Sequence, residues 1–141
     1  MNLPVRDKDG PVISDVKVTN VTNKGYDVSC KVTDPSGVDR VMFPTWTTAN
    51  GQDDLLSDWS TNAKAHGTQN GDTWTFHVDI ADHNNEGGEY CTDIHAYDKY
   101  GNASGWNAPR ISIDTEAPVI SDVKVSNITT EGYDVSCTVT D

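Results

Sequence analysis

Apolar and polar residues alternate along most of the chain, and this period of two is typical of half-buried β-strands. The alternation is clearest in residues 12–19 and 25–33, which are also rich in β-branched residues. No window of ten or more residues has the apolar period of a helix. In residues 73–80 every second side chain is large and apolar, so we expect four residues there to face a core: Trp74, Phe76, Val78 and Ile80.

Turn sequences divide these alternating segments. Residues 23–25, 34–37 and 69–72 combine Gly with Asn, Asp or Pro, and the last of them predicts a hairpin turn. The sequence predicts further strands at residues 38–46, 55–66, 89–98 and 105–113.

Two residues refine this pattern. Pro44 indicates an edge position or a bulge in its strand. Tyr90, which follows a polar corner at residues 81–88, has the position of a tyrosine-corner residue. We therefore expect an all-β fold, an immunoglobulin-like antiparallel β-sandwich of about seven strands.

The start of the sequence recurs near its end. Residues 11–34 return as residues 118–141 at a constant offset of 107, and 19 of the 24 aligned positions are identical. This offset is too long for a solenoid unit and fits a small domain. We predict an inter-repeat linker at 1–9, a complete repeat at 10–116, and the first two strands of a following repeat at 117–141.

The second copy raises a question of stability. An isolated two-stranded unit is marginal in water. We therefore expect residues 118–141 to form either a loosely ordered tail or a strand-exchanged dimer between two molecules.

The charge of the chain limits its partners. It has 22 acidic and 10 basic residues, a formal net charge of −12. Because this charge repels phosphates, we expect no nucleic acid and no anionic membrane surface as a partner. No stretch approaches the roughly 20 apolar residues of a membrane span. An acidic surface does suit a secreted module and can collect divalent cations.

The cysteines leave two alternatives open. Cys30 lies early and Cys91 late in the repeat, which suggests a disulfide in an oxidising compartment, and Cys137 is the second copy of Cys30. Strand parity places Cys30 on the core side of its strand but points Cys91 outward, whereas a bridge needs converging Cβ atoms. The sequence predicts either a Cys30–Cys91 disulfide or a buried small hydrophobe together with a free thiol.

Two segments resemble a known family. VMFPTWTTANGQDD at residues 41–54 and HNNEGGEYCTDIHAYD at residues 83–98 are similar to the Bsp-like (GBS Bsp-like) repeats of bacterial cell-surface and cell-wall proteins. The resemblance covers residues 10–116, and residues 117–141 resemble the opening of another repeat. It implies an extracellular Ig-like module, often present in multiples beside cell-wall hydrolase or adhesin domains, and it transfers no catalytic residue.

Tryptophans make glycan binding a candidate function, because aromatic rings stack on sugars while amides and carboxylates bind hydroxyl groups. Trp59 and Trp106 lie in polar, Gly/Asn/Ser-rich surroundings, whereas Trp46 is either such a residue or a core tryptophan. The alternative is a structured loop whose Asp and Asn side chains cap its own backbone. The candidate glycan-binding residues are Trp46, Asn50, Gln52, Asp53, Asp54 and Trp59.

Acidic residues are expected to gather at one end of the sandwich, where its inlet meets two of its turns. Calcium binds about six to eight oxygen atoms, and a repeat junction is a sensible place to stiffen an array. The alternative is that turns of an acidic protein are rich in Asp. Asp114, Glu116 and Asp141 repeat part of this set 107 residues later. The candidate calcium ligands are Asp7, Asp9, Asp34, Asp98 and Asn102.

No catalytic constellation stands out in the sequence. The four histidines lack the spacing of a zinc-ligand pair, and no serine lies in a nucleophile elbow. We therefore expect a non-catalytic spacer or positioning module of a secreted or wall-attached bacterial protein, with neighbouring repeats and domains of the same chain as its partners. The alternative is a module that binds carbohydrate or cell-wall glycan.

Overall fold

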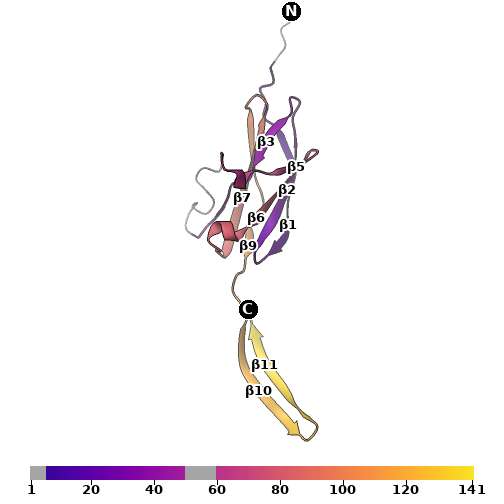
Figure 1. Cartoon of the computed structure of the whole chain (residues 1–141), viewed down its shortest axis with the longest axis vertical. Helices are drawn as coiled ribbons and strands as arrows, with labels where there is room; N and C mark the ends of the chain where they lie inside the picture. The colour runs from indigo at the N-terminus through magenta and orange to yellow at the C-terminus, as the bar shows by residue number, and fades with distance from the viewer. Residues whose placement is uncertain (1–5, 50–59) are drawn as a thin grey trace, which may run out of the picture.

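The computed structural model describes residues 6–49 and 60–141 and forms a two-layer β-sandwich followed by a separate hairpin (Figure 1). The first sheet has the order β1 (Val12–Thr22), β2 (Gly25–Thr33), β6 (Thr73–Asp79), β5 (Thr68–Asn70). The second is centred on β7 (Gly88–Asp98), with β3 (Val38–Met42) and β4 (Thr45–Thr47) along one edge, and β8 (Ala103–Asn107) and β9 (Ile111–Ile113) along the other.

The all-β prediction is confirmed, and every pairing within the two sheets is antiparallel. The strand order corresponds to the A-B-E-D and C-F-G sheets of a constant-type immunoglobulin sandwich, if β3/β4 and β8/β9 are each counted as one interrupted strand. Pro44 separates β3 from β4, so the predicted irregularity at this proline is present. The immunoglobulin-like assignment is our interpretation of this order.

One predicted strand is wrong over its described part. Residues 60–66 contain a 3₁₀ turn, η1 (Ala63–Ala65), in place of the strand expected at 55–66. The Asn62 side chain caps this turn by accepting a hydrogen bond from the Lys64 backbone N–H at 2.9 Å. Ala65 is fully buried against Met42, so a local cap and one small apolar contact decide this segment.

The core lies between the two sheets, as the alternation predicts. Trp74, Val78 and Ile80 are buried, and Phe76 is half-buried and stacks on the ring of Phe43 at 5.2 Å. The corner between β6 and β7 is a second 3₁₀ turn, η2 (Ile80–His83), in which His83 is buried.

Two tyrosines stabilise this core through their hydroxyl groups. The Tyr90 hydroxyl donates to the Glu86 carbonyl at 2.7 Å, which is the bond expected of a tyrosine corner. The Tyr26 hydroxyl lies 2.6 Å from Thr92 Oγ1, which in turn lies 2.9 Å from Thr45 Oγ1. This buried chain of hydroxyls links β2 in one sheet to β7 and β4 in the other.

The second copy forms a hairpin of its own, β10 (Val119–Thr129) and β11 (Gly132–Thr140). Its pairing repeats that of β1 and β2 residue for residue, from Val12↔Thr33 and Val119↔Thr140 onward, including both register shifts. In Figure 1 it extends away from the sandwich, and its apolar side chains are exposed. The predicted boundaries at residues 9 and 116 remain a prediction, since the strands define only the span Val12–Ile113 for the sandwich.

The predicted Cys30–Cys91 disulfide is absent from the structure, where both cysteines are buried free thiols. Cys30 belongs to the core, whereas Cys91 lies outside the core cluster on the opposite face of β7, next to Trp46 in the register. The two side chains therefore point in different directions, as the parity argument required for the free-thiol alternative. Burial raises the pKa of the Cys30 thiol to about 11, which leaves little reactive thiolate at neutral pH.

Candidate functional site

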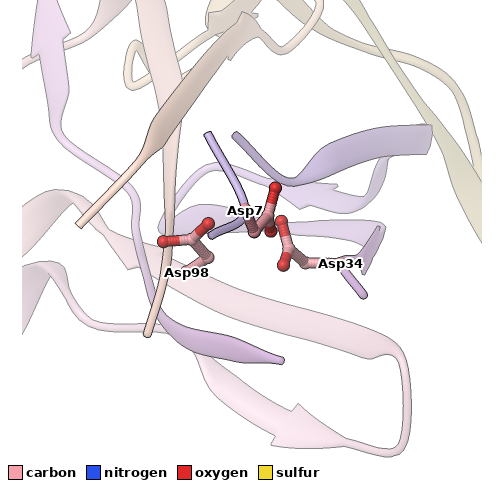
Figure 2. Close-up of side chains that lie close together, drawn as sticks. All are labelled: Asp7, Asp34 and Asp98. Atoms are coloured by element: carbon pink, nitrogen blue, oxygen red, sulfur yellow. The ribbon is translucent and has the colours of Figure 1, made fainter. Parts of the chain in front are cut away.

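Three carboxylates from separate parts of the chain converge at the end of the sandwich where the chain enters. Asp7 comes from the inlet before β1, Asp34 follows β2, and Asp98 ends β7. One oxygen of each lies within 4.8 Å of an oxygen of the others, and Figure 2 shows the three groups side by side. Two ligands of a single calcium ion at about 2.4 Å lie at most about 4.8 Å apart, so this spacing suits a shared cation.

Hydrogen bonds hold the carboxylates in place. Ser36 Oγ donates to Asp34 Oδ1 at 2.6 Å and lies 2.9 Å from Asp7 Oδ2. Asn102 Nδ2 donates to Asp98 Oδ2 at 2.7 Å and to the Asp7 backbone carbonyl at 2.9 Å. The sequence had not identified Ser36, although an Asp followed two residues later by Ser is a common side-chain-capped turn.

The electrostatics of the cluster favour its charged form. Burial opposes ionisation of Asp98, but hydrogen bonds from the Asn102 side chain and from the backbone N–H groups of Asn102 and Tyr100 outweigh it and lower the pKa of Asp98 below its ordinary value. Asp34 Oδ2 is buried and accepts no hydrogen bond within the described residues. A buried carboxylate oxygen normally has a partner, so this atom is available as a ligand at the cluster.

Two of the predicted calcium ligands, Asp9 and Asn102, make hydrogen bonds to the cluster. The Asp9 side chain does not belong to the cluster, and its backbone N–H donates to Asp7 Oδ1 at 3.0 Å. Asn102 donates its amide hydrogens to the Asp98 carboxylate and to the Asp7 backbone carbonyl. The bond within the inlet recurs at the next junction, where the Glu116 N–H donates to Asp114 Oδ1 at 2.9 Å.

The predicted glycan site stays a prediction, because Trp46 is the one of its six residues that lies within the described part of the chain. Asn50, Gln52, Asp53, Asp54 and Trp59 lie outside the described part of the chain. Trp46 is half-buried on β4, and the Arg110 guanidinium carbon lies 5.7 Å from the centre of its ring. The most exposed tryptophan of the described residues is instead Trp106 on β8, at 61%. The sequence had placed Trp106 in polar surroundings but not in the candidate site.

The described helices are single 3₁₀ turns, and none is long and apolar enough to cross a membrane.

The fold and the recurrence of its first hairpin define the class: an all-β sandwich module whose first two strands recur later in the chain. Residues 15–111 match the GBS Bsp-like repeat, and the chain belongs to that family. Repeats of this family occur in bacterial surface proteins.

The chain was also compared with curated proteins and with solved structures. No curated protein matches the chain. A solved structure of a polysaccharide deacetylase from Bacillus cereus aligns at 18% identity with a TM-score of 0.44, covering 78% of this chain and 31% of that one. The chain therefore spans less than a third of the deacetylase chain.

Proposed function

We propose that this chain is a non-catalytic spacer from a secreted or wall-attached bacterial protein, which projects or positions a neighbouring domain. The observation that carries the proposal is the route of the chain. It enters beside Asp98, at one end of β7, and it leaves after Ile113, which pairs with Gly88 at the other end. Units joined in this way add their lengths along one axis (Figure 1).

The length of each unit follows from its strands. β7 and β10 each have 11 residues, which corresponds to about 37 Å per strand. Because the second hairpin begins a new unit with the strand register of the first, it supports a head-to-tail array. Membership of a family that occurs in bacterial surface proteins supports the extracellular location.

Small-angle X-ray scattering of the chain tests the spacer. Sandwich and hairpin placed end to end predict a maximum dimension of at least about 75 Å in a monomer. A maximum of about 45 Å would mean that the hairpin folds back against the sandwich, and it would contradict a linear spacer.

Calcium at the inlet is the second part of the proposal. Bound there, the ion would connect the inlet to the β2–β3 turn and to the end of β7, and so stiffen the junction between successive units. The convergent carboxylates and the unpartnered, buried Asp34 Oδ2 support this role. Neutralising three neighbouring negative charges would also stabilise the fold, because like charges at this spacing repel each other.

A matched pair of variants tests the calcium proposal. Asp34 and Asp141 occupy the same position in the two copies, but only Asp34 has Asp7 and Asp98 beside it. Calcium at about 10 mM should raise the free energy of unfolding by about 1–3 kcal/mol, as expected for a site of submillimolar to millimolar affinity. Asp34→Asn should abolish most of this gain, and Asp141→Asn should retain it. Equal gains in both variants, or none in the unmodified chain, would contradict a calcium site.

A further inference from the structure

The second hairpin presents an apolar face to solvent. Val125 pairs with Val135 and Ile120 with Val139, so these side chains share one face of the hairpin, and all of them are exposed. The equivalent residues of the first hairpin are buried in the core or packed against it. A contiguous apolar face of this kind marks an interaction surface, because its burial is favourable.

We propose that β10–β11 docks onto the sandwich of a second copy of this chain and takes the place of β1–β2 there. The structure already contains the complementary surface, because it is the surface that β1–β2 covers. This surface consists of β6, with which β2 pairs, and the inner face of the second sheet. The proposal concerns self-association and does not depend on the spacer function.

The two hairpins have the same residues wherever the first one meets the core. Every core-facing residue of β1 and β2 is identical in β10 and β11. The positions at which the hairpins differ are all exposed in the first one, so the differences do not affect its packing. They are Thr19, Val21, Asn23, Lys24 and Lys31.

Specific contacts of the first hairpin would also be reproduced. The Tyr26 hydroxyl lies 2.6 Å from Thr92 Oγ1, and Tyr133 is the equivalent tyrosine. Gly25 lies so close to β6 that a Cβ atom on it would overlap a backbone oxygen, and glycine recurs at this position as Gly132. The incoming hairpin therefore fits the acceptor surface in shape and in hydrogen bonding.

The hairpin cannot dock in this way onto its own sandwich. Ile113, the end of β9, pairs with Gly88 at one end of β7, and β10 begins at Val119. To replace β1, Val119 would have to reach the position of Val12, which lies toward Asp98 at the other end of β7. The 11 residues of β7 span about 37 Å, whereas the chain from Ile113 to Val119 spans at most about 22 Å. The acceptor must therefore be another molecule.

Exchange between two unmodified chains leaves the total burial unchanged, because each docked hairpin displaces an equivalent one. The exchanged dimer is therefore a minor species of the unmodified chain, since association costs entropy. The balance shifts when β1–β2 fits its own sandwich less well than the incoming hairpin does. Tyr26→Ala creates this situation, because it damages the first hairpin and leaves the face of β10–β11 unaltered.

Two native thiols report which hairpin is docked. Cys137 is exposed, whereas its equivalent Cys30 is buried in the core. Exchange would invert this pattern, because the docked hairpin buries Cys137 and the displaced hairpin exposes Cys30. Cys91 is buried and belongs to neither hairpin, so its labelling reports global unfolding. The experiment is labelling of the reduced chain with N-ethylmaleimide, mapped by mass spectrometry, together with the molar mass from light scattering.

After refolding at high protein concentration, Tyr26→Ala should form dimers. In these dimers Cys30 should react at least about tenfold faster than in the unmodified chain, and Cys137 at least about tenfold more slowly. Tyr133→Ala is the matched control and should remain a monomer with the labelling pattern of the unmodified chain. The double variant Tyr26→Ala/Tyr133→Ala should lose the dimer, because neither of its hairpins then fits better than the other.

Three results would overturn the proposal. They are a Tyr26→Ala chain that stays monomeric at every concentration, a double variant that dimerises equally well, and a dimer in which Cys30 stays protected. The last result would mean that two exposed hairpins pack against each other. If labelling of Cys91 shows that Tyr26→Ala is unfolded, Val28→Ala and its control Val135→Ala provide the same test with a smaller cavity. None of these outcomes bears on the monomer dimensions or the calcium response that test the proposed function.

Discussion

The two hairpins of this chain have nearly the same sequence and different surroundings. β1–β2 and β10–β11 share their register, their bulges and the left-handed residues Asp15 and Asn20, which recur as Asp122 and Asn127. The Asn20–Asp27 hydrogen bond of 2.8 Å recurs between Asn127 and Asp134 at the same length. The two copies therefore adopt the same hairpin geometry in different surroundings.

Burial is what the second hairpin lacks. In β2 the inward side chains of Tyr26 and Val28 are 1% and 0% exposed, whereas Tyr133 and Val135 in β11 are 63% and 64% exposed. The first hairpin pairs with β6 and packs on the second sheet. The comparison therefore separates the strand register, which both hairpin sequences share, from burial, which the other strands of the sandwich provide.

The largest difference in the free energy of unfolding is expected from truncating the equivalent tyrosines, Tyr26 and Tyr133. Tyr26→Ala should lower the free energy of unfolding of the sandwich by about 3–5 kcal/mol, because it leaves a cavity and breaks the bond to Thr92. Tyr133→Ala should change it by less than about 0.5 kcal/mol. Urea denaturation of both variants measures this. Similar losses would show that the second hairpin is also packed in solution.

A smaller difference is expected at the equivalent glycines of the two turns. A Cβ atom on Gly25 would overlap the Val78 carbonyl oxygen of β6, whereas one on Gly132 has no atom within 4 Å. The two glycines have similar φ angles, 155° and 159°, so any intrinsic strain is shared. We expect Gly25→Ala to cost about 1–3 kcal/mol more than Gly132→Ala in thermal unfolding. Equal midpoints would mean that β6 does not contact this turn so closely.

The smallest difference in the free energy of unfolding is expected from replacing the equivalent aspartates Asp27 and Asp134, and it depends on pH. Hydrogen bonds that the Asp27 carboxylate accepts from the Asn20 and His77 side chains lower the pKa of Asp27 in the folded state. A lowered pKa stabilises the fold at pH values above the ordinary value of 3.8, and this contribution disappears as the pH falls through the folded-state pKa.

At pH 6, Asp27→Asn should therefore reduce stability by a few tenths of a kcal/mol, since the pair is partly exposed, and the loss should vanish near pH 2. Asp134→Asn, which has no β6 strand beside it, is the control and should have no effect on the sandwich at either pH. A loss of equal size at both pH values would assign the effect of Asp27 to packing instead of charge.

The sequence predicts most of the strands because their alternation is local. It fails at residues 60–66, where a cap by Asn62 and the burial of Ala65 under a distant strand decide the structure. The contact between Ala65 and Met42 forms only once the sheet is assembled, so a periodic pattern in the sequence cannot predict it.

The candidate site was also predictable only in part. The fold brings Asp7, Asp34 and Asp98 together as the predicted topology requires, because inlet and turns share one end of the sandwich. The sequence could not show that Asp9 contributes only its backbone, or that Asn102 serves as a donor to its neighbours.

The comparison of the two hairpins rests on one central claim, that β10–β11 begins a unit whose burial is not supplied by the sandwich before it. Amide hydrogen exchange of the monomer, read by mass spectrometry over both hairpins, tests this claim most directly. We expect β2 amides to exchange only on global unfolding, and β11 amides to exchange orders of magnitude faster. Equal protection of β2 and β11 in a monomer would contradict the account, whereas protection of β11 only in a dimer would demonstrate the predicted strand exchange through residues 118–141.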